Sequence, residues 1–121
     1  MLSQELPPDL VWSLRALCQP YASQVELYPS GVCLGDELAE DFADAYYRFC
    51  ELNPGSVPSD LKALEQLMLS KSGVVEHWED PALRSGDFWE EIRACAKKCL
   101  MSRGLTTFAP HRSEKTYVFG P

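Results

Sequence analysis

Apolar residues recur every three or four positions over long parts of the chain, which predicts amphipathic helices. The clearest pattern covers residues 36–52, where acidic residues occupy the first turns and Asn53-Pro-Gly follows the last apolar position. The same spacing predicts helices over 8–19, over 60–71 and from Asp87 to just before Gly104, with a single helical turn from Asp80 to Arg84. The apolar face of the 36–52 helix would contain Leu38, Phe42, Ala45 and Phe49.

Two other stretches have a pattern typical of strands. Residues 24–35 alternate apolar and polar side chains around a Pro-Ser-Gly turn signal, which favours a short hairpin or an extended connection. Residues 105–109 and 116–119 are rich in Thr, Phe, Tyr and Val and flank a polar loop, which predicts a C-terminal β-hairpin. The expected fold is mainly α (α+β): a bundle of about four helices with a short C-terminal β-hairpin, in one domain over residues 1–121.

The charge of the chain is strongly uneven. The net charge is −7 and the pI is about 4.7. Residues 1–47 carry −7, residues 48–92 carry −5 and residues 93–121 carry +5. An acidic protein repels phosphate backbones and anionic membrane surfaces, so we expect neither nucleic acid nor membrane as a partner. The cations near the C-terminal end do not cancel the net negative charge of the chain. Several of them lie near the predicted end of a helix, where positive charge is favourable.

The predicted 36–52 helix would carry a second, acidic face opposite its apolar stripe. Five carboxylates lie within an arc of roughly 140° at helical spacing, and an aromatic residue and a further acid share that face. Carboxylates and a tyrosine suit the recognition of a basic protein, and we expect Tyr28 to be a second aromatic anchor. A solvated face whose acids favour the helix N-terminus is the alternative interpretation. The residues of this face are Asp36, Glu37, Glu40, Asp41, Asp44, Tyr47 and Glu51.

No motif predicts a metal, a cofactor or catalysis. The acids lack the spacing of a calcium loop, and no Glu-x-x-His pair is present. His77 could in principle pair with Cys33 or Cys50, but the sequence signatures around catalytic cysteines are missing. The five cysteines form no C-x-x-C pair, so we expect reduced and mostly buried thiols. The sequence predicts a protein that is not an enzyme.

The chain begins without a cationic segment followed by an apolar stretch, so no secretory signal is expected. No segment has the apolar length that crosses a bilayer. Together with the cysteine usage, this predicts a cytoplasmic protein.

Part of the chain, over 61–104, resembles a known group of bacterial proteins. The residues that carry the resemblance are Leu61-x-x-Leu64, Ser72-Gly73, Trp78-x-Asp80-x-Ala82-Leu83, Trp89-x-x-Ile92-Arg93-x-x-Ala96 and Gly104. They are similar to residues of the small acidic immunity proteins encoded beside polymorphic toxins of type VI secretion and contact-dependent inhibition systems. The resemblance implies a cytoplasmic, largely helical protein that binds one toxin domain and occludes or distorts its active site.

Two classes of function are favoured; a third, a small enzyme, would require folding to bring His77 beside Cys33 or the acids into a closed pocket. In the first, the chain is an immunity protein whose acidic helix contacts a basic cognate toxin or effector domain. In the second, it is an acidic secretion chaperone that keeps an effector unfolded. The chaperone would be an obligate homodimer, whereas the inhibitor could be a monomer.

Overall fold

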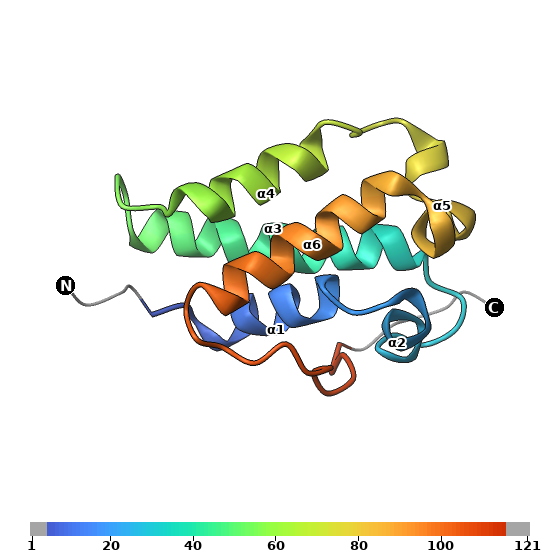
Figure 1. Ribbon diagram of the computed structural model, residues 1–121, viewed down its shortest axis with the longest axis horizontal. Coiled ribbons are helices and arrows are strands. Elements are labelled where there is room, and N and C mark those ends of the chain that lie inside the picture. Colours follow the sequence, from blue (N-terminus) through green and yellow to red (C-terminus); the bar gives the residue numbers. More distant parts are fainter. Residues whose placement is uncertain (1–4, 116–121) are drawn as a thin grey trace.

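Helices account for all of the regular structure in the part of the chain that the computed structural model describes, residues 5–115 (Figure 1). Within that range there are six α-helices, one short 3-10 helix and no strand. The elements are α1 (Pro8–Leu17), α2 (Tyr21–Glu26), α3 (Leu34–Leu52), α4 (Ser59–Leu69), η1 (Val75–His77), α5 (Asp80–Ser85) and α6 (Asp87–Met101).

Two packed helices, α1 and α6, connect the other helices. Helix α1 contacts both α3 and α6, while α4 packs against α6 and α5 lies against α6 and η1. Figure 1 shows α4 above and α1 below, with the long helices α3 and α6 between them. α3 packs mainly on α1, and α4 packs mainly on α6.

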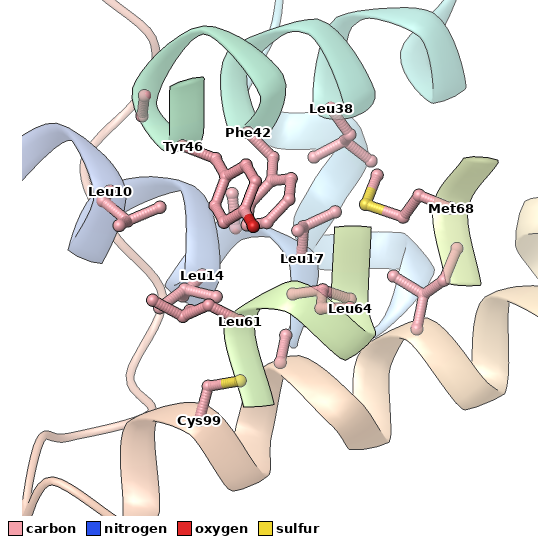
Figure 2. Close-up of a cluster of buried hydrophobic side chains, with 14 of the residues drawn as sticks. Leu10, Leu14, Leu17, Leu38, Phe42, Tyr46, Leu61, Leu64, Met68 and Cys99 are labelled. Carbon is pink, nitrogen blue, oxygen red and sulfur yellow. The ribbon is translucent and has the colours of Figure 1, made fainter. Parts of the chain in front are cut away.

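The core is formed by the apolar stripes that the spacing predicts. Leu10, Leu14 and Leu17 of α1 are fully buried. In Figure 2 they lie close to Phe42 and Tyr46 of α3, whose rings stack with centroids 5.5 Å apart. Leucines of α4 and Cys99 of α6 complete this cluster. Burial of these faces, which removes about 25 cal/mol per Å² of apolar surface from water, holds the helices together.

The hairpin interpretation of residues 24–35 is wrong. Pro20 precedes α2, and Gln24 within α2 is buried. The Gln24 amide donates hydrogen bonds to the carbonyl oxygens of Ala16 and Leu17, at 3.1 and 3.2 Å. These carbonyls belong to the last turn of α1, where the helix itself supplies no donor, and the Ala16 oxygen also accepts from the Gln19 N–H at 3.4 Å. Residues 27–33 form an irregular connection to α3.

The predicted C-terminal β-hairpin is also wrong, although the mainly helical class is confirmed. Residues 105–109 form no strand and run beside α1. The carbonyl oxygens of Thr106 and Thr107 accept hydrogen bonds from Arg15 Nε and Gln19 Nε2, both at 2.9 Å. Side chains of α1 and of the turn after it thus satisfy backbone groups that a second strand would otherwise have paired. The other predicted strand, residues 116–119, lies outside the described residues.

The other predicted elements are present, with ends shifted by one to two residues, which is normal for helix boundaries. The start of α3 lies unusually close to another segment of the chain. A Cβ added at Gly35 would lie 2.6 Å from the carbonyl oxygen of Trp78, so only glycine lets the start of α3 approach this segment so closely. The contact places Trp78 beside the first turn of α3.

None of the described helices combines the length and apolar character needed to cross a bilayer.

Candidate functional site

The predicted acidic face is divided between two flanks of α3. Glu37 and Asp41 are half-buried on one flank, whereas Asp36 and Glu40 are exposed on the other. Asp44 is exposed near Asp41, and Glu51 is exposed in the last turn. The structure therefore brings the seven residues onto one helix, as the spacing predicts, but gives its two flanks different surroundings.

One flank already contacts a cation of the same chain. Lys115 Nζ lies 2.5 Å from Asp41 Oδ1 and 3.7 Å from Glu37 Oε2. The Tyr28 hydroxyl donates a hydrogen bond to the other carboxylate oxygen of Asp41. Only 4% of Tyr28 is exposed, and its ring packs edge-on against Trp12. Tyr28 therefore positions Asp41 from inside the protein and presents almost no surface to a partner.

The other flank of α3 borders an open groove of about 430 Å³, which we call the α3–α4 groove. Its floor is formed by small or apolar residues of α3 and α4, and Trp78 lies at the end near the start of α3. Carboxylates project from its edges, and no Lys or Arg is among the described residues that line it. The floor consists of Ala39, Phe42, Ala43 and Met68, and the carboxylates are those of Asp36, Glu40, Glu65 and Glu79.

Large apolar side chains are exposed along the groove. The exposed fractions are 53% for Leu69, 63% for Val75 and 46% for Tyr47. The Tyr47 hydroxyl donates a hydrogen bond of 2.8 Å to Glu65 Oε2, which links α3 to α4. Exposed apolar surface bordered by polar residues is typical of an interaction site. Tyr47 is the predicted aromatic residue that is exposed and lines the groove.

The carboxylates beside the groove repel one another. The pKa of Glu40 is raised, first by partial burial and then by the charges of Glu37, Asp36 and Asp44, while Lys115 acts in the opposite direction. A raised carboxyl pKa means that the charged form is disfavoured at this position. A cation brought into the groove would relieve this cost, so the electrostatics favour a positively charged occupant.

Sequence reasoning missed the α4 and η1 side of the groove. Glu65, Leu69 and Val75 were not among the predicted site residues, and they line the groove together with Trp78. Two signals could have identified them. Leu69 lies outside the inward stripe of its helix, and Val74-Val75 is an apolar pair within a polar connection. Neither signal shows by itself that these residues face α3.

The described residues do not form a catalytic cysteine pair or a metal cluster. Neither Cys33 nor Cys50 donates a hydrogen bond to a histidine in residues 5–115; Cys33 Sγ donates to the Trp78 carbonyl oxygen, 3.8 Å away. Burial raises the pKa of the Cys33 thiol, which disfavours the nucleophilic thiolate. The His77 ring packs edge-on against Phe88. Nowhere in this range do three or more Cys, His, Asp or Glu side chains gather as metal ligands.

Several cations of the 93–115 region have structural partners. Arg93 is buried and bonds to groups of four other residues. Arg103 forms a bidentate ion pair with Asp60, at 2.7 and 2.9 Å. With Lys115 held by Asp41, these cations connect parts of the fold, while Asp36 and Glu40 on the flank beside the groove form no ion pair within residues 5–115.

Comparison with known proteins identifies no relative that bears on this site. No family model matches the chain, and no curated protein or solved structure matches it either. The functional interpretation therefore depends on the burial, charge and contacts of the residues themselves.

Proposed function

We propose that this protein is an immunity protein that binds and neutralises a cognate bacterial toxin domain through the acidic surface of α3. The observation that carries the proposal is the exposure of four α3 carboxylates that form no ion pair within residues 5–115. Clustered like charges on a helix cost stability, so an ionic partner outside the chain gives them a role. The four residues are Asp36, Glu40, Asp44 and Glu51.

Complementary charge would act mainly on the rate of association. A net charge of −7 attracts a basic toxin domain, and exposed carboxylates orient it before contact. Tyr47 is exposed at the centre of this surface and supplies contact area with few rotatable bonds. Glu37 and Asp41 contribute less, because both already form ion pairs with Lys115. Neutralisation follows if the bound protein covers the active site of the toxin.

To test the proposal, each reading frame that neighbours the gene is expressed first by itself and then together with this chain. Growth of the cells is measured in both cases. We expect one neighbour to be toxic and its toxicity to be relieved by the chain. Binding kinetics with that neighbour are then measured for D36N/E40Q/D44N and for the control E26Q/E76Q/E91Q, which removes three exposed acids elsewhere. Both variants change the net charge equally.

The α3 variant is expected to lower the association rate about tenfold and to reduce its dependence on salt, while the control changes the rate less than about twofold. If both variants lower the association rate equally, the net charge of the protein causes the attraction and α3 is not the interface. The absence of any neighbour whose toxicity is relieved would refute the immunity function itself.

A secretion chaperone remains the second candidate, because the α3–α4 groove exposes apolar surface of the kind that holds an unfolded effector segment. The two functions predict different assemblies. A chaperone is expected to be a homodimer at low micromolar concentration and to keep its client unfolded. Light scattering of the isolated chain and circular dichroism of the complex distinguish it from a monomeric inhibitor bound to a folded toxin.

A further inference from the structure

We propose that the α3–α4 groove holds an amphipathic, cationic helix of the partner protein. This inference rests on the proposed function, and it adds the chemical nature of the segment that is recognised. Four features of the molecule favour such an occupant: the dimensions of the groove, its apolar floor, the charge of its edges and the absence of a sheet edge in the described residues.

The groove has the length of a short helix. The α3 residues that line it extend from Asp36 to Tyr47. Eleven steps along a helix correspond to roughly 16 Å, or about three turns of a helix lying parallel to α3. A volume of about 430 Å³ holds a row of side chains from one face of such a helix, not a whole folded element.

The walls of the groove offer side chains rather than free backbone groups. α3 and α4 use their main-chain groups in their own helical hydrogen bonds, and residues 5–115 contain no strand edge to which an extended peptide could add. An occupant must therefore satisfy its own backbone, which a helix does. Docking an apolar helix face into a groove between helices is a known mode of peptide recognition.

Apolar contacts would provide the affinity. Leu69 and Val75 are more than half exposed and stand beside a floor that includes Phe42 and Met68. A helix with apolar residues spaced three and four apart would cover these side chains along one stripe. Covering exposed apolar surface is the main favourable contribution to most protein associations.

Charge selects which amphipathic helix fits. Asp36 and Glu40 lie on the α3 side of the groove, Glu65 on the α4 side, and Glu79 follows η1. Lys or Arg residues flanking the apolar stripe of the occupant would meet carboxylates on both sides. A helix with acidic flanks would bring like charges together, which opposes binding.

The test uses a synthetic peptide of about 15 residues, with leucines on one face and lysines on both flanks, long enough to form a helix once bound. Its affinity is measured by calorimetry for the wild type and two groove variants, Leu69→Ser and Ala43→Trp. The matched controls are Leu52→Ser and Ala94→Trp. Leu52 is also an exposed leucine at the last position of a helix, and neither control residue lines the groove.

We expect each groove variant to weaken peptide binding about tenfold and each control to leave it within about twofold. Ala43→Trp fills the groove, and thermal melting shows whether this variant is folded. If Ala43→Trp is unfolded, the result for Leu69→Ser is used to test the inference, because the exposed Leu69 side chain is not needed for folding. Unchanged affinity of the groove variants would overturn the inference. Equal binding of a scrambled peptide of the same composition would also overturn it, because charge alone would then explain the attraction.

Two further measurements separate this inference from the function on which it rests. Dodecyltrimethylammonium, a small cationic amphiphile, is titrated in parallel. If it binds and the peptide does not, the groove holds a small amphiphile and not a helix, which overturns the inference. Leu69→Ser is also tested against the toxin identified from the neighbouring genes. If D36N/E40Q/D44N slows toxin binding while Leu69→Ser has no effect on toxin or peptide, the groove inference fails and the immunity function stands.

Discussion

The buried Arg93 and the carboxylates beside the α3–α4 groove show two opposite uses of charge in one small protein. Arg93 is 7% exposed, and it donates hydrogen bonds to Gln24 Oε1, Glu90 Oε1 and the carbonyl oxygens of Gln19 and Leu83. The groove carboxylates are mostly exposed and form no ion pair within the described part of the chain.

This difference distinguishes charges that hold the fold from charges that are available for binding. Arg93 connects α6 to α5, to α2 and to the end of α1, so a charge that is costly to bury is compensated by four partners. Among the described residues, no buried side-chain nitrogen or oxygen lacks a hydrogen-bond partner. Apart from Glu65, which accepts a hydrogen bond from Tyr47, the groove carboxylates have no comparable internal role, and removing them should cost the fold little.

Replacing Arg93 by Met should have the largest effect on stability. It leaves the oxygens of Gln24, Leu83 and Gln19 without their donors, and we expect the free energy of unfolding to fall by about 3–5 kcal/mol. Urea denaturation followed by circular dichroism measures the loss. The control is Arg84→Met, which removes an exposed guanidinium 5.3 Å from the Tyr21 ring and should cost less than about 1 kcal/mol. Similar losses for the two variants would contradict the special role of Arg93.

Replacing Asp60 by Asn should have an intermediate and pH-dependent effect. Asp60 accepts two hydrogen bonds from Arg103, which lower the pKa of its carboxyl. A lowered folded-state pKa adds stability at neutral pH that is lost as the pH falls below about 4. The pair is partly exposed, so we expect a cost of about 1 kcal/mol at pH 7, and a smaller difference between variant and wild type at pH 3. A difference that stays constant between these pH values would show that the ion pair does not cause it.

Replacing Tyr47 by Phe should cost about 0.5 kcal/mol, because the variant loses only a half-exposed hydrogen bond to Glu65. Thermal unfolding measures this difference. In the proposed complex the aromatic ring remains, so the affinity for the partner should change less with Tyr47→Phe than with Tyr47→Ala. A loss of stability as large as that of Arg93→Met would mean that the hydroxyl holds α3 and α4 together, and that the site is structural.

Replacing Glu40 by Gln should have the smallest effect on stability, and it should stabilise the protein, whereas the other replacements destabilise it. Because the pKa of Glu40 is raised, its charge is a cost to the folded state at neutral pH, so the variant should be more stable by a few tenths of a kcal/mol. This cost is complete above the folded-state pKa and disappears as the pH falls below about 4, where the carboxyl is protonated in both states. Equal stability at pH 7 would remove the argument that Glu40 prefers a cationic partner.

Much of the helical framework could be predicted because periodicity records which side chains face inward. Leu38, Phe42, Ala45 and Phe49 are buried as the spacing of 36–52 predicts, and the acids of the same helix lie on its outer side. Local signals also located the helix ends, since Asn53-Pro-Gly follows α3 and Gly104 follows α6 within a few residues. These features depend on neighbours along the chain, which a sequence displays directly.

The errors and omissions all involve contacts between distant residues. The alternation in 24–35 and the Thr- and Phe-rich 105–109 indicate strands locally, but Gln24 bonds to the end of α1, and Arg15 and Gln19 bond to the carbonyls of Thr106 and Thr107. Tertiary partners therefore satisfied the backbone and side-chain groups that a hairpin would have used.

Composition and spacing are properties of the chain alone, so they establish an acidic, mainly helical protein with a band of carboxylates on one helix. Three features come from the folded arrangement: Lys115 pairs with Glu37 and Asp41, Tyr28 is buried, and Asp36 and Glu40 lie beside an apolar groove. The energy of a charge depends on which distant groups and how much water surround it, and folding sets both.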